Sequence, residues 1–145
     1  MKGSAERFLE DVKRQRSLVA ALERDRERIR VEIISLRSPE LGERVQSGRQ
    51  KDLSDAVIRL EDAEKKVGRE LERLIRMRDE ASRLIAREPE PKLRAVLYSW
   101  YIMDEGIHEI AAAMGISERH IWRMKKEAFY HLEKAAAEQG NFPDF

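Results

Sequence analysis

The chain has 145 residues, the length of one domain or of two small ones. Charged residues make up 39% of it and aromatic residues 6%, with 7 Gly and 4 Pro, a composition typical of long helices. The absence of cysteine excludes disulfide scaffolds, zinc ribbons and thiol enzymes. No apolar run reaches the roughly 18 residues that a membrane span needs, and no secretory segment is visible. We therefore expect a cytoplasmic protein without a membrane partner.

The first predicted element is one long helix over residues 5–36. Its apolar residues recur at alternating spacings of four and three, the pattern of coiled coils and helical bundles. Charged residues fill most of the positions between them, as on a solvated helix face. The apolar positions are Phe8, Val12, Val19, Leu22, Ile29, Ile33 and Leu36, and the polar exceptions are Gln15 and Arg26.

Residues 37–52 break this pattern and predict the loop of a helical hairpin. Pro39 disfavours helical backbone at Ser38, and Gly42 and Gly48 add loop character. A second pattern of the same kind then predicts a helix from Leu53 to residue 85. Its apolar positions are Leu53, Val57, Leu60, Val67, Leu71, Leu74, Ala81 and Ile85, and the polar exceptions are Glu64 and Arg78.

Antiparallel pairing of the two helices, with Leu36 beside Leu53, brings Arg26 opposite Glu64. Two interpretations stay open: both side chains extend to solvent, or they form an ion pair that fixes the register of the helices. Apolar residues outside the pattern suggest a second contact surface, so we predict a homodimer through the hairpins, as in a four-helix bundle. These residues are Leu9, Leu18, Ile34, Ile58, Ile75 and Leu84.

Pro89 and Pro91 mark a boundary, because two prolines in alternate positions end a helix and stiffen the junction. The sequence thus predicts an all-α fold with a coiled-coil hairpin domain over 1–88, a second domain over 89–140 and a tail over 141–145. In the second domain, short amphipathic helices are expected over 92–103 and 107–114. A third helix is expected over 117–138.

The last two of these helices have the spacing of a helix-turn-helix. Ala111 is small enough for two helices to cross closely, and Gly115 can take the positive φ of a sharp turn. Ser117 is a good N-cap, and Ile121 returns an apolar side chain to the core. We therefore predict a three-helix DNA-binding domain over 89–140, in which residues 117–138 form the recognition helix.

The face of this helix opposite its core carries Arg119, Arg123, Lys126 and Tyr130. The N-terminal part of a recognition helix meets base edges, where arginine reads guanine, glutamate accepts from cytosine and lysine contacts phosphate. An ordinary solvated face is the alternative. The predicted DNA-binding residues are Ser117, Glu118, Arg119, His120, Trp122, Arg123, Lys126 and Tyr130.

Two features of this domain leave questions open. Trp122 lies outside the expected core, and it contacts either a thymine methyl group, a partner protein or the hairpin. From Pro89 to Phe145 the chain has seven Lys and Arg against nine Asp and Glu, a net charge of −2. Because affinity for DNA comes largely from phosphate neutralisation, tight binding is expected to need two copies acting together.

The C-terminal part of the chain resembles region four of bacterial sigma factors. The likeness is carried by residues 93–100 and by EGIHEIAAAMGISERHIWRMKKEAFYHLEK over residues 105–134. The resemblance implies that Ser117 opens the recognition helix and that Glu118, Arg119, Trp122 and Arg123 contact DNA. The melting segment, region two, is missing, so the chain is not a complete sigma factor.

The whole layout is similar to small phage and prophage late-gene regulators of the ArpU type, which pair a helical hairpin with a sigma-like helix-turn-helix. The fragments ERVQSG (43–48), DLSDAVIRLEDAE (52–64) and SERHIWR (117–123) carry this likeness. It implies a transcriptional regulator of phage or prophage genes that binds double-stranded DNA, with RNA polymerase as a candidate second partner.

No enzyme, cofactor or metal is predicted. His108-Glu109 begins like a zinc-protease helix, but the residue four positions after His108 is Ala112 instead of a second histidine. Two alternatives to a regulator stay open. One is an interaction module that binds RNA polymerase or another protein without DNA, and the other is a phage DNA-packaging component.

Overall fold

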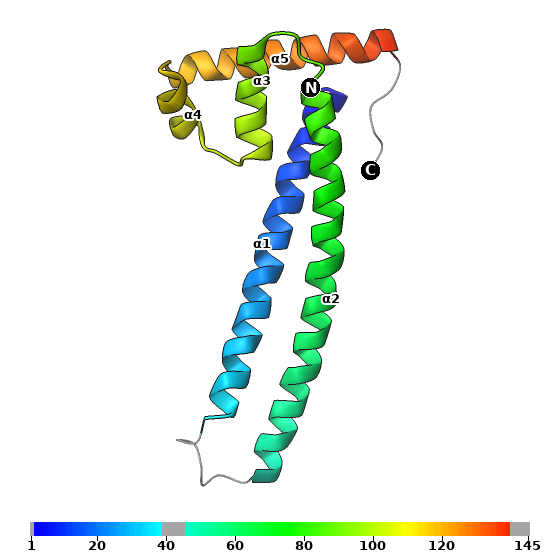
Figure 1. The fold of residues 1–145 in the computed structure, drawn as a ribbon, viewed down its shortest axis with the longest axis vertical. Coiled ribbons are helices and arrows are strands. Elements are labelled where there is room, and N and C mark those ends of the chain that lie inside the picture. The colour runs from blue at the N-terminus through cyan, green and yellow to red at the C-terminus, as the bar shows by residue number, and fades with distance from the viewer. Residues whose placement is uncertain (1, 39–45, 140–145) are drawn as a thin grey trace. The chain divides into compact units, whose positions relative to one another are not determined.

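The computed structural model describes residues 2–38 and 46–139, and in these ranges the chain is all-helical. The all-α prediction is confirmed for this part of the chain. The elements are α1 (Ser4–Leu36), α2 (Gln46–Ile85), α3 (Pro91–Leu97), the π-helix η2 (Tyr98–Ile102), α4 (Ile107–Met114) and α5 (Glu118–Gln139) (Figure 1). None of the described helices is long and apolar enough to cross a membrane.

The helix α1 matches the prediction to within one residue, whereas α2 begins at Gln46 instead of Leu53. Residues 46–52, predicted as loop, are therefore helical. The helix tolerates Gly48 there because one glycine costs only about 1 kcal/mol relative to alanine. The rest of the predicted loop (39–45) and the tail (141–145) lie outside the described residues.

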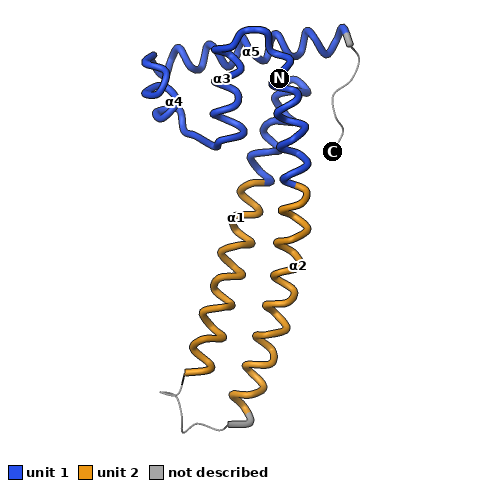
Figure 2. Tube along the Cα trace, in the orientation of Figure 1, with its two compact units in different colours: residues 1–15, 74–145 blue, residues 16–73 orange. Residues whose placement is uncertain are grey.

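The chain divides into two compact units (Figure 2). Unit 1 consists of residues 1–15 and 74–145, and unit 2 consists of residues 16–73. The predicted domain over 89–140 thus shares unit 1 with the first turns of α1 and the last turns of α2. The bounds of the predicted domain, 89–140, stay a prediction.

In unit 2, α1 and α2 run antiparallel. Arg26 NH1 lies 3.4 Å from Glu64 Oε2, and Arg59 NH2 lies 2.7 Å from Glu32 Oε1. The predicted opposition of Arg26 and Glu64 is confirmed. The buried residues between the helices are Ile29, Ile33, Ala56 and Ala63, with Leu36, Leu53, Val57 and Leu60 packed against them.

The buried side of α2 is only partly the predicted one, since Val67, Leu74, Ala81 and Ile85 are buried as expected. Ala56 and Ala63 in unit 2 and Met77 in unit 1 are buried, whereas Leu71 is 40% exposed. The prediction favoured large apolar residues, but alanine allows the backbones of paired helices to approach closely, and this moves Leu71 to the rim. Two residues of the expected second contact surface, Leu9 and Leu84, are buried within unit 1. Leu18, Ile34, Ile58 and Ile75 are exposed as expected.

In unit 1, α5 packs against α3 and α4 (Figure 1). The helix expected over 92–103 becomes a π-helix at Tyr98 and ends at Ile102. The chain then turns at Asp104, whose φ of 55° is tolerated because aspartate is among the few residues that enter the left-handed region. The largest apolar side chains that are fully buried in unit 1 are Tyr101, Leu9, Leu97, Ile102, Ile110, Ile121 and Leu132.

Candidate nucleic-acid interface

The turn between α4 and α5 has the predicted chemistry. Gly115 ends α4 with φ 68° and ψ 32°, and its backbone N–H donates to the carbonyl oxygen of Ala111. Ser117 Oγ accepts a hydrogen bond from His120 N at 3.1 Å, so it caps α5 as expected. The left-handed glycine and the serine cap together fix the direction in which α5 leaves the turn.

Three basic side chains and one tyrosine lie on the solvent side of α5. Arg119, Arg123 and Lys126 are exposed, and Tyr130 is 66% exposed. The opposite side of the helix is buried against α3 and α4 through the predicted core residue Ile121 and through Met124, Ala128 and Leu132. We call Arg119, Arg123, Lys126 and Tyr130 the basic face.

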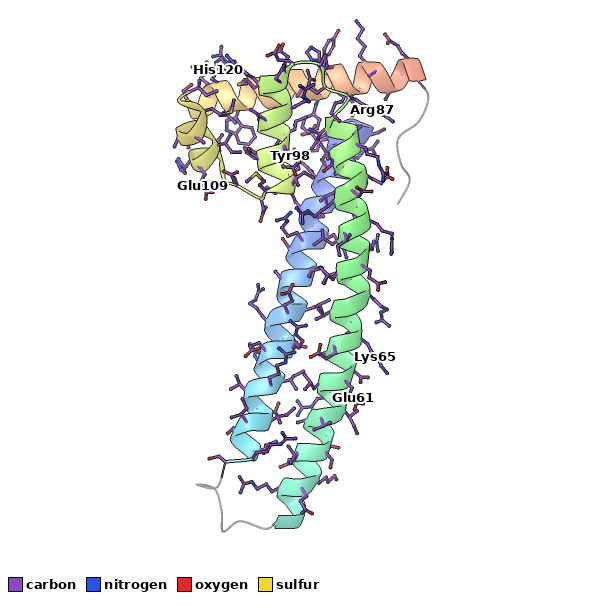
Figure 3. All side chains as sticks on the ribbon, in the orientation of Figure 1. Glu61, Lys65, Arg87, Tyr98, Glu109 and His120 are labelled. Atoms are coloured by element: carbon purple, nitrogen blue, oxygen red, sulfur yellow. The ribbon has the colours of Figure 1, made fainter. Side chains whose placement is uncertain are left out.

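Two further predicted residues contact neighbouring side chains. Glu118 is half-buried, and its carboxylate contacts the imidazole of His108 on α4. His120 lies exposed near the start of α5 (Figure 3), with its Nδ1 3.3 Å from Arg123 NH2. Glu118 therefore makes an exposed contact with α4, while His120 borders the basic face.

Trp122 is 51% exposed and packs against Trp100 of η2. The two ring centroids lie 5.1 Å apart with an interplanar angle of 64°, an edge-to-face geometry. Lys125, one turn along α5, is only 8% exposed. Its Nζ lies 4.3 Å from the ring centroid of Trp100, 5.0 Å from that of Trp122 and 5.3 Å from that of Tyr101.

A second lysine reaches this group from α1. Lys13 Nζ donates to the backbone oxygen of Trp100 at 3.2 Å and lies 5.2 Å from the centroid of its ring. It also lies 3.5 Å from Asp104 Oδ1. We call Lys13, Trp100, Tyr101, Trp122 and Lys125 the lysine–aromatic cluster. The cluster lines a groove of about 530 Å³ together with Lys2 and with Glu6, Glu10 and Arg14 of α1.

Burial dominates the electrostatics of the cluster. Loss of hydration lowers the pKa of Lys125, an effect that the carboxylates of Glu6 and Glu10 oppose. Burial also raises the pKa of the Tyr101 phenol, and the same two carboxylates add to that shift. The Tyr101 hydroxyl makes no hydrogen bond to any residue that the structure describes.

Two polar contacts join α5 to distant parts of unit 1. Ala5 N donates to Glu133 Oε1 at 2.7 Å, so a carboxylate of α5 satisfies a free N–H group in the first turn of α1. His131 Nδ1 donates to Glu88, with distances of 2.9 and 3.0 Å to the two carboxylate oxygens. The Glu88 side chain is fully buried, and its Oε1 also accepts from Glu90 N at 3.1 Å.

A family model described as a protein of unknown function (DUF1492) matches residues 35–133, more than half of the chain. The chain belongs to this family. Comparisons with curated proteins and with solved structures give no match. The part of the DUF1492 chain that matches contains α3, η2, α4 and α5 up to residue 133, and it therefore includes the whole basic face.

The predicted site residues of this DUF1492 chain fall into two groups. Arg119, Arg123, Lys126 and Tyr130 share the solvent side of α5, and His120 borders them. Ser117, Glu118 and Trp122 instead make contacts within unit 1. In the described ranges, no group of three or more His, Asp or Glu side chains is placed to hold a metal ion.

Sequence reasoning missed Lys125, Glu133 and Glu88. Only Lys125 carried a local signal, because it lies three residues after Trp122 and therefore on the same side of a helix.

The net charge of unit 1 differs from the net charge of −2 counted over residues 89–145 alone. Unit 1 carries as many Lys and Arg as Asp and Glu, because the ends of α1 and α2 each add a net positive charge.

Proposed function

We propose that this chain is a sequence-specific DNA-binding transcriptional regulator of phage or prophage genes. One observation carries the proposal: three exposed basic residues lie on the solvent side of a helix that follows a left-handed glycine turn and a serine cap. This is the local chemistry of a helix-turn-helix, whose second helix enters the major groove. The resemblance to sigma region four and to ArpU-type regulators supports the same function.

The geometry suggests a role for each residue of the basic face. Arg119 and Arg123 lie in the first two turns of α5, the part that meets base edges, and each can bond a guanine through two donors. Lys126 lies nearly one turn further along and fits a phosphate contact. Tyr130 lies a further turn along the same side. Ser117 positions the helix through its cap.

Self-association through a hairpin of α1 and α2 belongs to the same proposal. Unit 1 has no excess of positive charge, so one copy neutralises few phosphates, and two linked copies bind the same duplex more tightly. Unit 2 exposes Val31 and Ile34 of α1 and Ile58 of α2, and Ile34 is 69% exposed. Burial of these β-branched side chains by a second copy would stabilise a homodimer. Sedimentation at micromolar concentration should give the dimer mass, and a monomer mass would exclude this part of the proposal.

The DNA-binding claim is tested with a triple variant, Arg119→Ala, Arg123→Ala and Lys126→Ala. The matched control removes three exposed basic residues from α2, through Lys65→Ala, Lys66→Ala and Arg69→Ala, so the net charge falls equally in both variants. Figure 3 shows Lys65 on α2. We expect the first variant to lose at least about 30-fold in affinity for a selected duplex, because each arginine–guanine pair contributes about 1–3 kcal/mol. Equal affinities of the two variants would contradict the proposal.

A second candidate is an interaction module that binds RNA polymerase or another protein without DNA. The half-exposed Trp122 favours it, since exposed aromatic side chains are common at the centre of protein interfaces. The triple variant separates the two functions. Binding to a protein partner through Trp122 would survive loss of the three basic side chains, whereas binding to a duplex would not.

A further inference from the structure

We infer that Lys125 is a positioning residue, whose ammonium group fastens the first turns of α1 to α5 and thereby fixes the orientation of the basic face. The DNA-binding part of this inference rests on the proposed function. The fastening itself does not, because it concerns contacts within unit 1.

Lys125 lies beside the basic residues in sequence but is unlike them in environment. It is 8% exposed, whereas Arg123 and Lys126 are exposed. Its Nζ lies within about 5 Å of three ring centroids, which belong to Trp100, Tyr101 and Trp122. The electron-rich faces of these rings replace part of the water that the ammonium group loses on burial. An ammonium held in this way is not available to a DNA phosphate.

The first turns of α1 complete the environment of this ammonium. Lys13 Nζ lies over the same Trp100 ring and bonds the Trp100 carbonyl oxygen, so α1 is fastened to η2 beside Lys125. The positive charge of Lys13 disfavours the Lys125 ammonium, whereas the carboxylates of Glu6 and Glu10 favour it. The two carboxylates of α1 thus favour the cationic form of Lys125 among the rings.

The contacts of Trp122 connect this cluster to the basic face. Trp122 lies three residues after Arg119 and four before Lys126, so the three side chains are neighbours along α5. Its ring is held by Trp100 and by Lys125. Rotation of α5 about its axis would break these contacts. The cluster therefore sets the direction in which Arg119 and Lys126 project.

The test compares Lys125→Met, which keeps an unbranched apolar stem without charge, with Lys125→Arg, which keeps a cation over the rings. The chain has two tryptophans and both lie in the cluster, so its tryptophan emission reports the cluster alone. We expect Lys125→Met to change the emission spectrum and to speed amide exchange over residues 4–14. Lys125→Arg should stay close to the unchanged chain in both measurements. Lys13→Met, on the α1 side, should reproduce the faster exchange if Lys125→Met does not fold.

The DNA arm uses the salt dependence of affinity for a selected duplex. Loss of positioning in Lys125→Met should weaken binding about tenfold while leaving the slope of log affinity against log salt unchanged, because no phosphate contact is lost. Lys126→Ala should instead reduce the magnitude of this slope by about one, because one phosphate contact is lost. An equal fall of the slope in Lys125→Met would make Lys125 a phosphate contact and overturn the inference.

The emission and exchange measurements decide the fastening without DNA. Unchanged emission and exchange in both Lys125→Met and Lys13→Met would exclude the positioning role. If the unchanged chain binds no duplex, the proposed function fails, and these two measurements still decide whether Lys125 fastens α1 to α5.

Discussion

Arg26 of α1 and Glu64 of α2 form an ion pair across the two helices of unit 2, with NH1 and Oε2 3.4 Å apart. Glu64 Oε1 also lies 2.7 Å from Arg30 NH2. One carboxylate therefore bridges two arginines that are four residues apart on α1. Both residues of the Arg26–Glu64 pair occupy positions where the apolar pattern of their helix is interrupted, so they mark one register of the antiparallel helices.

Replacement of both residues, Arg26→Leu with Glu64→Leu, tests whether the pair specifies this register. A partly exposed ion pair contributes at most about 1 kcal/mol to the free energy of unfolding. Replacement of both partners by leucine should therefore leave stability unchanged or raise it slightly. We expect the unique pairing to be lost, seen by sedimentation as a mixture of oligomers, because without this ion pair the apolar pattern of unit 2 permits shifted pairings. A single species with the original mass would remove the register role.

The contact between Gly3 and Glu133 gives a second prediction. A Cβ at Gly3 would collide with the carboxyl group of Glu133, which accepts the hydrogen bond from Ala5 N. Gly3→Ala must therefore displace Glu133, and we expect a loss of about 1 kcal/mol in the free energy of unfolding. Chemical denaturation measures it.

Gly68→Ala is the matched control for Gly3→Ala. An added Cβ at Gly68 meets no atom within 4 Å, and Gly68 lies inside α2. Since alanine favours helix over glycine, we expect this variant to gain about 1 kcal/mol. Equal effects of the two substitutions would contradict the cap on α1.

The pair of Glu88 and His131 gives a third prediction. Glu88 is fully buried in the connection between α2 and α3, and His131 of α5 donates to both of its oxygens. His131→Ala leaves a buried carboxylate without this donor, so we expect a loss of about 2–3 kcal/mol in the free energy of unfolding. His108→Ala removes an exposed histidine and should cost less than about 0.5 kcal/mol. An equally small effect of His131→Ala and His108→Ala would contradict a stabilising contact between His131 and Glu88.

Tyr101 gives a prediction of the opposite sign. Its side chain is fully buried and packs edge-to-face on Phe129 at a centroid distance of 5.8 Å, while its hydroxyl has no hydrogen-bond partner among the described residues. Tyr101→Phe removes a desolvated polar group and keeps the ring, so we expect unchanged stability or a gain of up to about 1 kcal/mol. Thermal denaturation of the two chains measures the difference. A clear loss of stability would mean that a water molecule in the adjacent groove bonds the hydroxyl.

Local patterns predicted α1, the left-handed turn at Gly115 and the cap at Ser117 because their causes lie within a few residues of sequence. The buried side of α2 was predicted less well. Ala56 and Ala63 carry little hydrophobicity, and their burial follows from the closeness of α1, which the α2 sequence alone does not contain.

The contacts that organise unit 1 could not be read from local patterns. Ala5 and Glu133 are 128 residues apart, and Lys13 and Trp100 are 87 apart. Each depends on the three-dimensional path of the chain, since neither residue type nor spacing distinguishes Glu133 from the other glutamates of α5. The burial of Lys125 follows from the same path, because α1 and η2 supply the groups around it.

The central claim is that the basic face of α5 reads a DNA sequence. The most direct measurement is selection from a pool of randomised DNA duplexes on the immobilised full chain, at about 0.15 M salt so that non-specific phosphate contacts are weakened. The account predicts enrichment of one sequence motif, and its loss when Arg119 and Arg123 are replaced by alanine. Recovery of no motif by a folded chain would contradict DNA recognition and favour the second candidate, an interaction module that binds a protein partner.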